Sequence, residues 1–166
     1  MAIPQTTYPL NMALAFEGGL VDGSYDSHIV TASNAAAASF FGRACLIVAG
    51  EEHRFVQPTG TAGVFMGILV HTHAIEQSQV TAGGAGLPVN HPCGILRKGR
   101  IWVVVEEAVT TTDDVFYRHA TPGADPEFLG RFRTDADTAA ATQITAARWV
   151  SAAAAGGLAK LEINLP

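Results

Sequence analysis

The carboxy-terminal segment of the chain alternates apolar and polar residues with a period of two. Every second residue is apolar, namely Ala159, Leu161, Ile163 and Leu165. The residues between them are polar, namely Lys160, Glu162 and Asn164. This alternation is typical of a β-strand with one buried face and one solvated face. We therefore predict a strand here, and the polar residues of its wet face are the better contact candidates of the segment.

A second strand pattern covers residues 99–107, where apolar side chains occupy both series. One face would carry Ile101, Val103 and Val105, and the other Trp102 and Val104. Apolar residues on both faces predict a central strand that is buried on both sides and leaves the core at Glu106 and Glu107. Because adjacent strand residues point to opposite faces, these two glutamates are not expected to form a paired acid and base.

Earlier in the chain, two continuous apolar runs of strand length, 43–49 and 63–73, also predict buried strands. The charged residues 51–54, which follow Gly50, are interpreted as a turn. Short strands separated by turn signals, with no sustained helical period, favour an all-β chain, an antiparallel β-sandwich or jelly-roll-like domain. We expect a single β domain over 12–166 and, because Pro4 and Pro9 favour extended backbone, an extended N-terminal arm over 1–11.

Composition narrows the functional classes. The chain has 166 residues, a formal net charge of −5 and only 15% charged residues. This balance argues against a nucleic-acid partner, which requires clustered Lys and Arg. No apolar run reaches the length of a membrane-spanning helix, and the start lacks the pattern of a signal peptide, so we expect no membrane partner and synthesis in the cytoplasm.

Two cysteines and two loop carboxylates are candidates for reactive groups. Cys45 and Cys93 could pair, but two cysteines without a CxxC motif are expected to be reduced, small apolar residues. Nothing in the sequence orients His91 toward Cys93 as a base for a thiol nucleophile. Asp135 and Asp137 lie in a polar stretch, 134–143, that is interpreted as a connecting loop with solvated carboxylates.

His71 and His73 are the best candidates for metal ligands. On a strand, residues i and i+2 share a face, so both imidazoles could reach one ion, and Glu76 follows closely. The arrangement partly resembles the first cupin motif, although the histidine-to-glutamate spacing is short and only His91 could supply a further ligand. The alternative function is therefore a cupin-like metal-binding protein or small metalloenzyme. If they bind no metal, the two histidines are interpreted as polar residues at the end of a strand or at a subunit contact.

Several segments of the second half resemble one known family, the structural cement proteins that decorate the heads of tailed bacteriophages. The similar segments are Gly-Arg-Ile-Trp-Val-Val-Val-Glu-Glu-Ala-Val (99–109), Val-Phe-Tyr-Arg (115–118), Gly-Arg-Phe (130–132), Ala-Ala-Arg-Trp-Val (146–150) and Leu-Glu-Ile-Asn-Leu (161–165). The similarity is best over 92–166, and none of these segments carries a catalytic motif.

This resemblance implies a non-enzymatic protein on the outer surface of a virion capsid. Its partners would be the major capsid protein of a phage head and further copies of itself, as a homodimer or homotrimer, with the N-terminal arm contributing to contacts. It implies no catalytic residue, no cofactor and no metal. A self-assembling shell or fibre component outside the phage context remains a further alternative.

Overall fold

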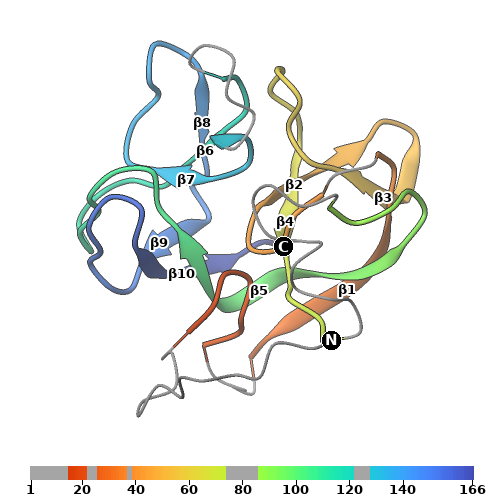
Figure 1. The fold of residues 1–166 in the computed structure, drawn as a ribbon, viewed down its shortest axis with the longest axis horizontal. Helices are drawn as coiled ribbons and strands as arrows, with labels where there is room; N and C mark the ends of the chain where they lie inside the picture. Colours follow the sequence, from red (N-terminus) through yellow and green to blue (C-terminus); the bar gives the residue numbers. More distant parts are fainter. Residues whose placement is uncertain (1–14, 22–25, 37–38, 74–85, 122–127) are drawn as a thin grey trace, which may run out of the picture.

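The computed structural model describes residues 15–21, 26–36, 39–73, 86–121 and 128–166. These residues form a seven-stranded sheet and a three-stranded sheet, and none of them is assigned to an α-helix (Figure 1). The prediction of an all-β chain is confirmed. The described residues also contain no helix long and apolar enough to cross a membrane. The predicted arm, 1–11, lies outside the described residues, so the arm and the domain boundary after it stay predictions.

Five strands close on themselves into a barrel. β1 (His28–Asn34) pairs antiparallel with β5 (Pro92–Val104) and parallel with β3 (Glu51–Val56). β2 (Ala44–Val48) and β4 (Phe65–Leu69) complete the ring in the order β1-β3-β2-β4-β5. A closed ring leaves none of its five strands with a free edge. The expected sandwich or jelly roll is not confirmed, because the described strands close a barrel.

The long strand β5 carries the sheet beyond the barrel. Its second half pairs antiparallel with β10 (Leu158–Asn164), and β10 pairs with β9 (Ala147–Trp149). On the other edge of β5, Gly18 N donates to Trp102 O at 2.8 Å, and Trp102 N donates to Gly19 O at 2.8 Å. In this extension of the sheet, four segments lie side by side in the order residues 18–21, β5, β10 and β9.

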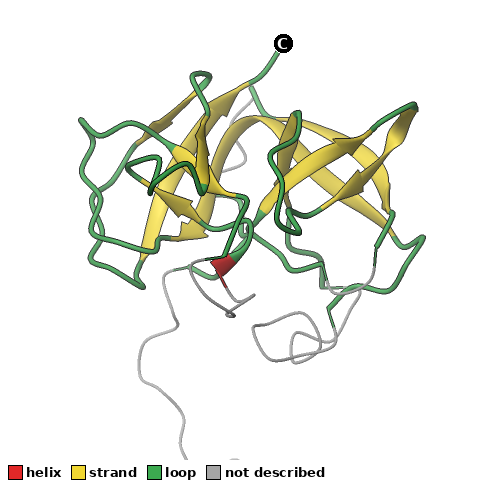
Figure 2. Ribbon diagram, turned by 90° about the horizontal axis from the view of Figure 1, so that it is seen from above, coloured by secondary structure: helices red, strands yellow, loops and turns green. Residues whose placement is uncertain are grey.

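A smaller sheet lies beyond the extension. It has the order β7-β6-β8, with β6 at Phe116–Arg118, β7 at Phe132–Arg133 and β8 at Ala141–Gln143. The view from above shows the strands gathered into two groups with loops between them (Figure 2). The stretch 134–143 was predicted to be a connecting loop, which is wrong for its last three residues, because they form β8.

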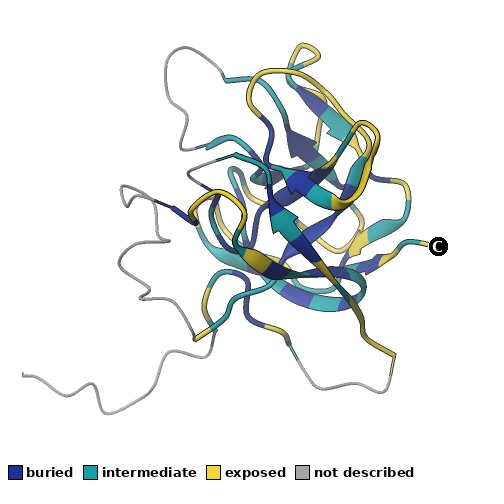
Figure 3. Cartoon of the chain, turned by 90° about the vertical axis from the view of Figure 1, so that its right-hand side faces the viewer, coloured by how far each residue is buried: buried dark blue, intermediate teal, exposed yellow. Residues whose placement is uncertain are grey.

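Two apolar cores share the wall formed by β2, β4 and the first half of β5. Cys45, Leu69 and Ile95 point into the barrel, where they pack with Phe55 and Leu87. Their neighbours in the same strands point the opposite way, into a second core beneath the extension and the small sheet: Ala44, Leu46, Ile68 and Leu96. In Figure 3, buried residues gather in the strands and exposed residues mainly in the loops. Burial on both faces thus explains the middle of each apolar run, 43–46 and 66–69, whereas Ile47 and Val64 are exposed.

Two local predictions were wrong. Residues 51–54 are not a turn: they begin β3, and the turn lies at Ala49–Gly50, where Gly50 adopts φ of 80°. The strand Ile101–Val105 is not buried on both sides. Its odd-numbered side chains are buried, but Trp102 and Val104 are only partly so, because nothing in the two described cores packs over that face.

Candidate functional site

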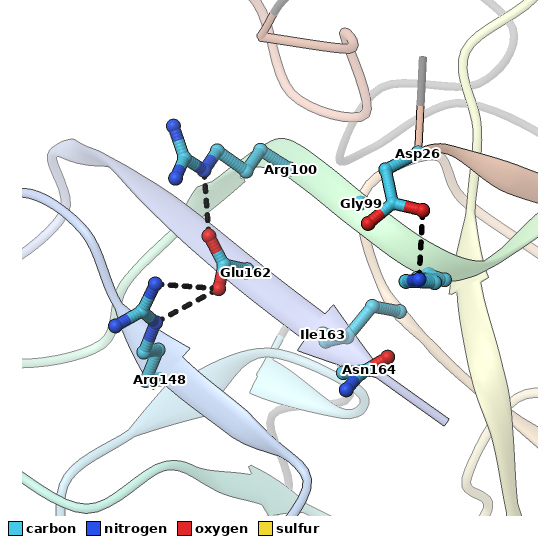
Figure 4. Close-up of a pocket in the computed structure, with 8 residues that line it drawn as sticks. Asp26, Gly99, Arg100, Arg148, Glu162, Ile163 and Asn164 are labelled. Atoms are coloured by element: carbon cyan, nitrogen blue, oxygen red, sulfur yellow. Dashed lines mark hydrogen bonds and ion pairs between the residues drawn. The ribbon is translucent and has the colours of Figure 1, made fainter. Parts of the chain in front are cut away.

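The wet face of β10 continues across β5 and β9 as one polar surface. A groove on this surface lies where the three strands meet the segment before β1 (Figure 4). It is lined by Asp26, Lys98, Gly99, Arg100, Arg148, Glu162, Ile163 and Asn164. A second groove adjoins it at Thr145–Ala147 and shares Arg148, Glu162, Ile163 and Asn164 with it. The alternation predicted for 159–165 is confirmed within β10, where Ala159, Leu161 and Ile163 are buried beneath this surface, and Leu165 beyond the strand end is partly buried.

Glu162 organises the groove. Arg100 Nε donates to one of its carboxylate oxygens at 2.6 Å, and Arg148 reaches the other at 2.7–2.8 Å (Figure 4). These three residues stand in cross-strand register, Arg100 opposite Glu162 and Glu162 opposite Arg148. The hydrogen bond from Arg100, with that from Arg148, holds the pKa of the Glu162 carboxyl below its ordinary value. Lys98 and Asp26 form a separate exposed pair at 2.7 Å.

Because the pKa of Glu162 is lower in the folded state, its contribution to stability is pH-dependent. The contribution is present above the ordinary pKa of 4.5 and is lost as the pH falls through the folded-state pKa. We expect Glu162→Gln to lower the free energy of unfolding at pH 7 by less than about 1 kcal/mol, since the pair is partly exposed, and by less still at pH 3. Urea unfolding at both pH values measures this difference.

The matched control is Glu52→Gln, at an exposed glutamate of β3 to which the described residues give no ion-pair partner. It removes one glutamate charge at a site without such a pair and so controls for the change in net charge. A Glu162→Gln effect that stays constant between pH 7 and pH 3 would contradict the ion-pair assignment.

Trp102 forms the apolar centre of the same face. It lies directly opposite Lys160 in the β5–β10 register, and the Lys160 ammonium sits 5.1 Å from the centroid of the Trp102 ring. That distance is within the range of cation–π attraction. Of the three contact candidates on β10, Lys160 and Glu162 hold defined partners, and Asn164 lies at the exposed end of the strand. Sequence alternation identified β10 but missed Arg100 and Arg148, whose positions depend on strand pairing.

A second polar cluster lies between the residues after β5 and the small sheet, with Glu106, Arg118 and Arg133 buried at its centre. Its members are Glu106, Glu107, Arg118, Arg133, Asp135 and Asp137. Arg118 Nε donates to both oxygens of Glu106 at 2.7 and 2.8 Å, and Arg118 Nη2 donates to Asp137 at 2.6 Å. The two loop aspartates expected to be solvated are therefore ion-paired, although Asp135 keeps 63% of its side chain exposed. The pairing makes this cluster structural scaffold for the small sheet.

The structure brings His71 and His73 together, but not on a strand. β4 ends at Leu69, and both histidines follow in coil, with ring centroids 4.9 Å apart. His71 packs between Phe16 and Phe41, and burial lowers its pKa. Glu76 lies outside the described residues. Among the residues that are described, no group of three or more His, Cys, Asp or Glu side chains is placed to hold a metal ion.

Both cysteines are buried and free, as expected. Cys93 Sγ lies 3.6 Å from His91 Nδ1, the one contact that could suggest an activated thiol. Burial, however, raises the pKa of the Cys93 thiol to about 11, so at neutral pH it is protonated and a poor nucleophile.

Nearly the whole chain, residues 3–164, matches the model of one protein family, which is described as "Structural cement protein (E217 gp24/Pam3 gp6)". Among solved structures, a chain from "The capsid of Myoviridae Phage XM1" has a similar fold, with a TM-score of 0.73. The two are 14% identical, and the alignment covers 99% of this chain and 98% of that one, so the likeness is one of fold. No curated protein sequence matches the chain significantly.

Proposed function

The chain belongs to the structural cement protein family of phages, and from this premise we propose that it binds the outer surface of a phage head and stabilises contacts between neighbouring major capsid proteins. The observation that carries the proposal is the family match, which extends over residues 3–164 and so includes both the barrel and the small sheet. The protein would then be a component of the virion, made in the host cytoplasm and added to the head.

The described structure supports a binding role without catalysis. The carboxylates of the two main polar clusters are held in ion pairs with arginine, and the thiol next to His91 is protonated at neutral pH. A cement protein needs no reactive group, because many identical weak contacts around a symmetric shell add up through avidity. We extend the proposal to self-association as a homodimer or homotrimer and to an N-terminal arm, 1–11, that reaches a neighbouring subunit.

The test is to mix the purified protein with expanded heads that are assembled from the cognate major capsid protein and lack decoration. We expect the protein to sediment with the heads at micromolar concentration and to raise the temperature at which they rupture. Unexpanded shells serve as the control for the maturation state of the surface. Heads that neither bind the protein at this concentration nor gain heat resistance would overturn the proposal.

A further inference from the structure

One sheet face combines an aromatic centre with fixed charges. We call it the Trp102 face and define it by Arg100 and Trp102 of β5, Lys160 and Glu162 of β10, and Arg148 of β9. None of these side chains belongs to either of the two cores formed by the described residues. A partly exposed tryptophan surrounded by charged groups has the composition of a binding hot spot with its polar rim.

The Trp102 face is positive, although the protein is acidic. It carries three basic side chains and one acidic side chain, a net charge of +2, in a chain whose formal net charge is −5. The neighbouring Lys98–Asp26 pair adds no net charge. The partner with complementary charge is therefore acidic at this position.

Contacts within the face hold its charges in place before any partner arrives. Glu162 lies between Arg100 and Arg148 and bonds to both, while the Lys160 ammonium rests on the Trp102 ring. Arg148 still keeps 68% of its side chain exposed, so its guanidinium has donors available to a further acceptor. Side chains fixed in advance lose less conformational entropy on binding, which favours affinity.

We propose that the Trp102 face is the surface by which the protein docks on the head, against a protein patch that presents carboxylates to Arg148 and Lys160 and an apolar side chain to Trp102. This inference rests on the proposed function and names the contact surface for it. A protein patch fits better than nucleic acid, because Glu162 would repel phosphates and the chain as a whole is acidic.

The experiment measures how the whole chain, three variants of the Trp102 face and one control variant bind to expanded, undecorated heads. Trp102→Ala should raise the Kd about 30-fold, the cost of losing a tryptophan hot spot. Arg148→Gln and Lys160→Gln should each raise it about three- to fivefold, and the affinity of the wild type should fall as salt is added. Arg54→Gln is the matched control, since Arg54 is a partly exposed arginine of β3 in the barrel.

The outcomes separate the inference from the function on which it rests. If the wild type binds heads and Arg148→Gln and Lys160→Gln bind as tightly as Arg54→Gln, the docking surface lies elsewhere and the inference is overturned. If the wild type does not bind, the proposed function fails and the inference falls with it. Tight binding of duplex DNA that the same two variants weaken would also overturn it. Thermal unfolding of Trp102→Ala shows whether its loss of binding reflects misfolding, and the two glutamine variants remain decisive if it does.

Discussion

Replacing Arg118 with alanine is expected to lower the free energy of unfolding by about 3–5 kcal/mol, the usual cost of removing one partner from a buried ion pair. The Arg118 side chain is only 3% exposed and that of Glu106 6% exposed. Without the guanidinium, Glu106 keeps Arg133 at 3.0 Å but loses the two-oxygen contact that offsets most of its burial. Urea unfolding followed by tryptophan fluorescence measures the loss.

Two comparisons identify the cause of this loss. Arg54→Ala removes a more exposed arginine that pairs with Glu51 at 3.0 Å, and should cost less than about 1 kcal/mol. The double replacement Glu106→Leu with Arg118→Leu should recover at least half of the Arg118→Ala loss, because no buried charge is then left without its partner. If Arg118→Ala costs no more than Arg54→Ala, the cluster is not a scaffold for the small sheet.

The loss should also depend on pH in a direction set by Glu106. Burial raises the pKa of this carboxyl in the folded protein, even though Arg118 and Arg133 act to lower it. Removing Arg118 takes away part of that opposing effect, so the folded-state pKa rises further. A carboxyl whose folded-state pKa is raised stabilises the fold when protonated. The deficit of Arg118→Ala should therefore shrink as the pH falls from 7 toward 4.

The sequence predicted those parts of the fold that depend on one strand at a time. Alternation identified the buried and wet faces of β10, and the continuous apolar run at 43–49 identified β2, whose first three residues are buried on both sides. Charge misled the interpretation where it conflicted with strand structure. Glu51 is the first of four charged or polar residues, yet it begins β3. The strand tolerates these residues because only Phe55, near its far end, reaches the barrel core.

Features that depend on pairing between distant segments could not be predicted. Barrel closure needs Ser33 and Asn34 to lie parallel to Arg54 and Phe55, and no periodicity encodes that register. The second polar cluster likewise draws its members from the residues just after β5, from β6, from β7 and from the loop after β7. From the sequence alone, each of these carboxylates is expected to be solvated. Only the tertiary fold places arginines beside them.

The candidate site also combines residues that the sequence predicts with residues whose positions depend on strand pairing. Lys160, Glu162 and Asn164 were identified from alternation alone, but the arginines that flank Glu162 come from the two neighbouring strands. The partial exposure of Trp102 was missed for a related reason. An apolar residue on a strand is expected to be covered, and whether another element covers it is a property of the assembled sheet. The resemblance to cement proteins held over far more of the chain than the segments that first suggested it.

Gly67→Ala is expected to be the most disruptive small substitution in the barrel, lowering the free energy of unfolding by about 3–5 kcal/mol through backbone strain and overpacking. Gly67 lies in β4 with φ of 153°, a conformation that residues with a side chain rarely adopt. An added Cβ would also meet the carbonyl oxygen of Leu96 and lie 2.7 Å from Ile95 Cγ2. Because the oxygen belongs to the backbone of β5, relief requires the β4–β5 pair of the barrel wall to separate.

Gly156→Ala isolates the conformational part of this cost. Gly156 also has a positive φ, 73°, but a Cβ there would meet nothing within 4 Å, so the substitution should cost only about 1 kcal/mol. The difference between the two variants in urea unfolding then measures the close approach of β4 to β5. Equal losses would show that the barrel wall tolerates a methyl group at Gly67. Since β5 runs from that wall directly into the Trp102 face, Gly67→Ala should also weaken head binding if β5 shifts, whereas Gly156→Ala should leave it unchanged.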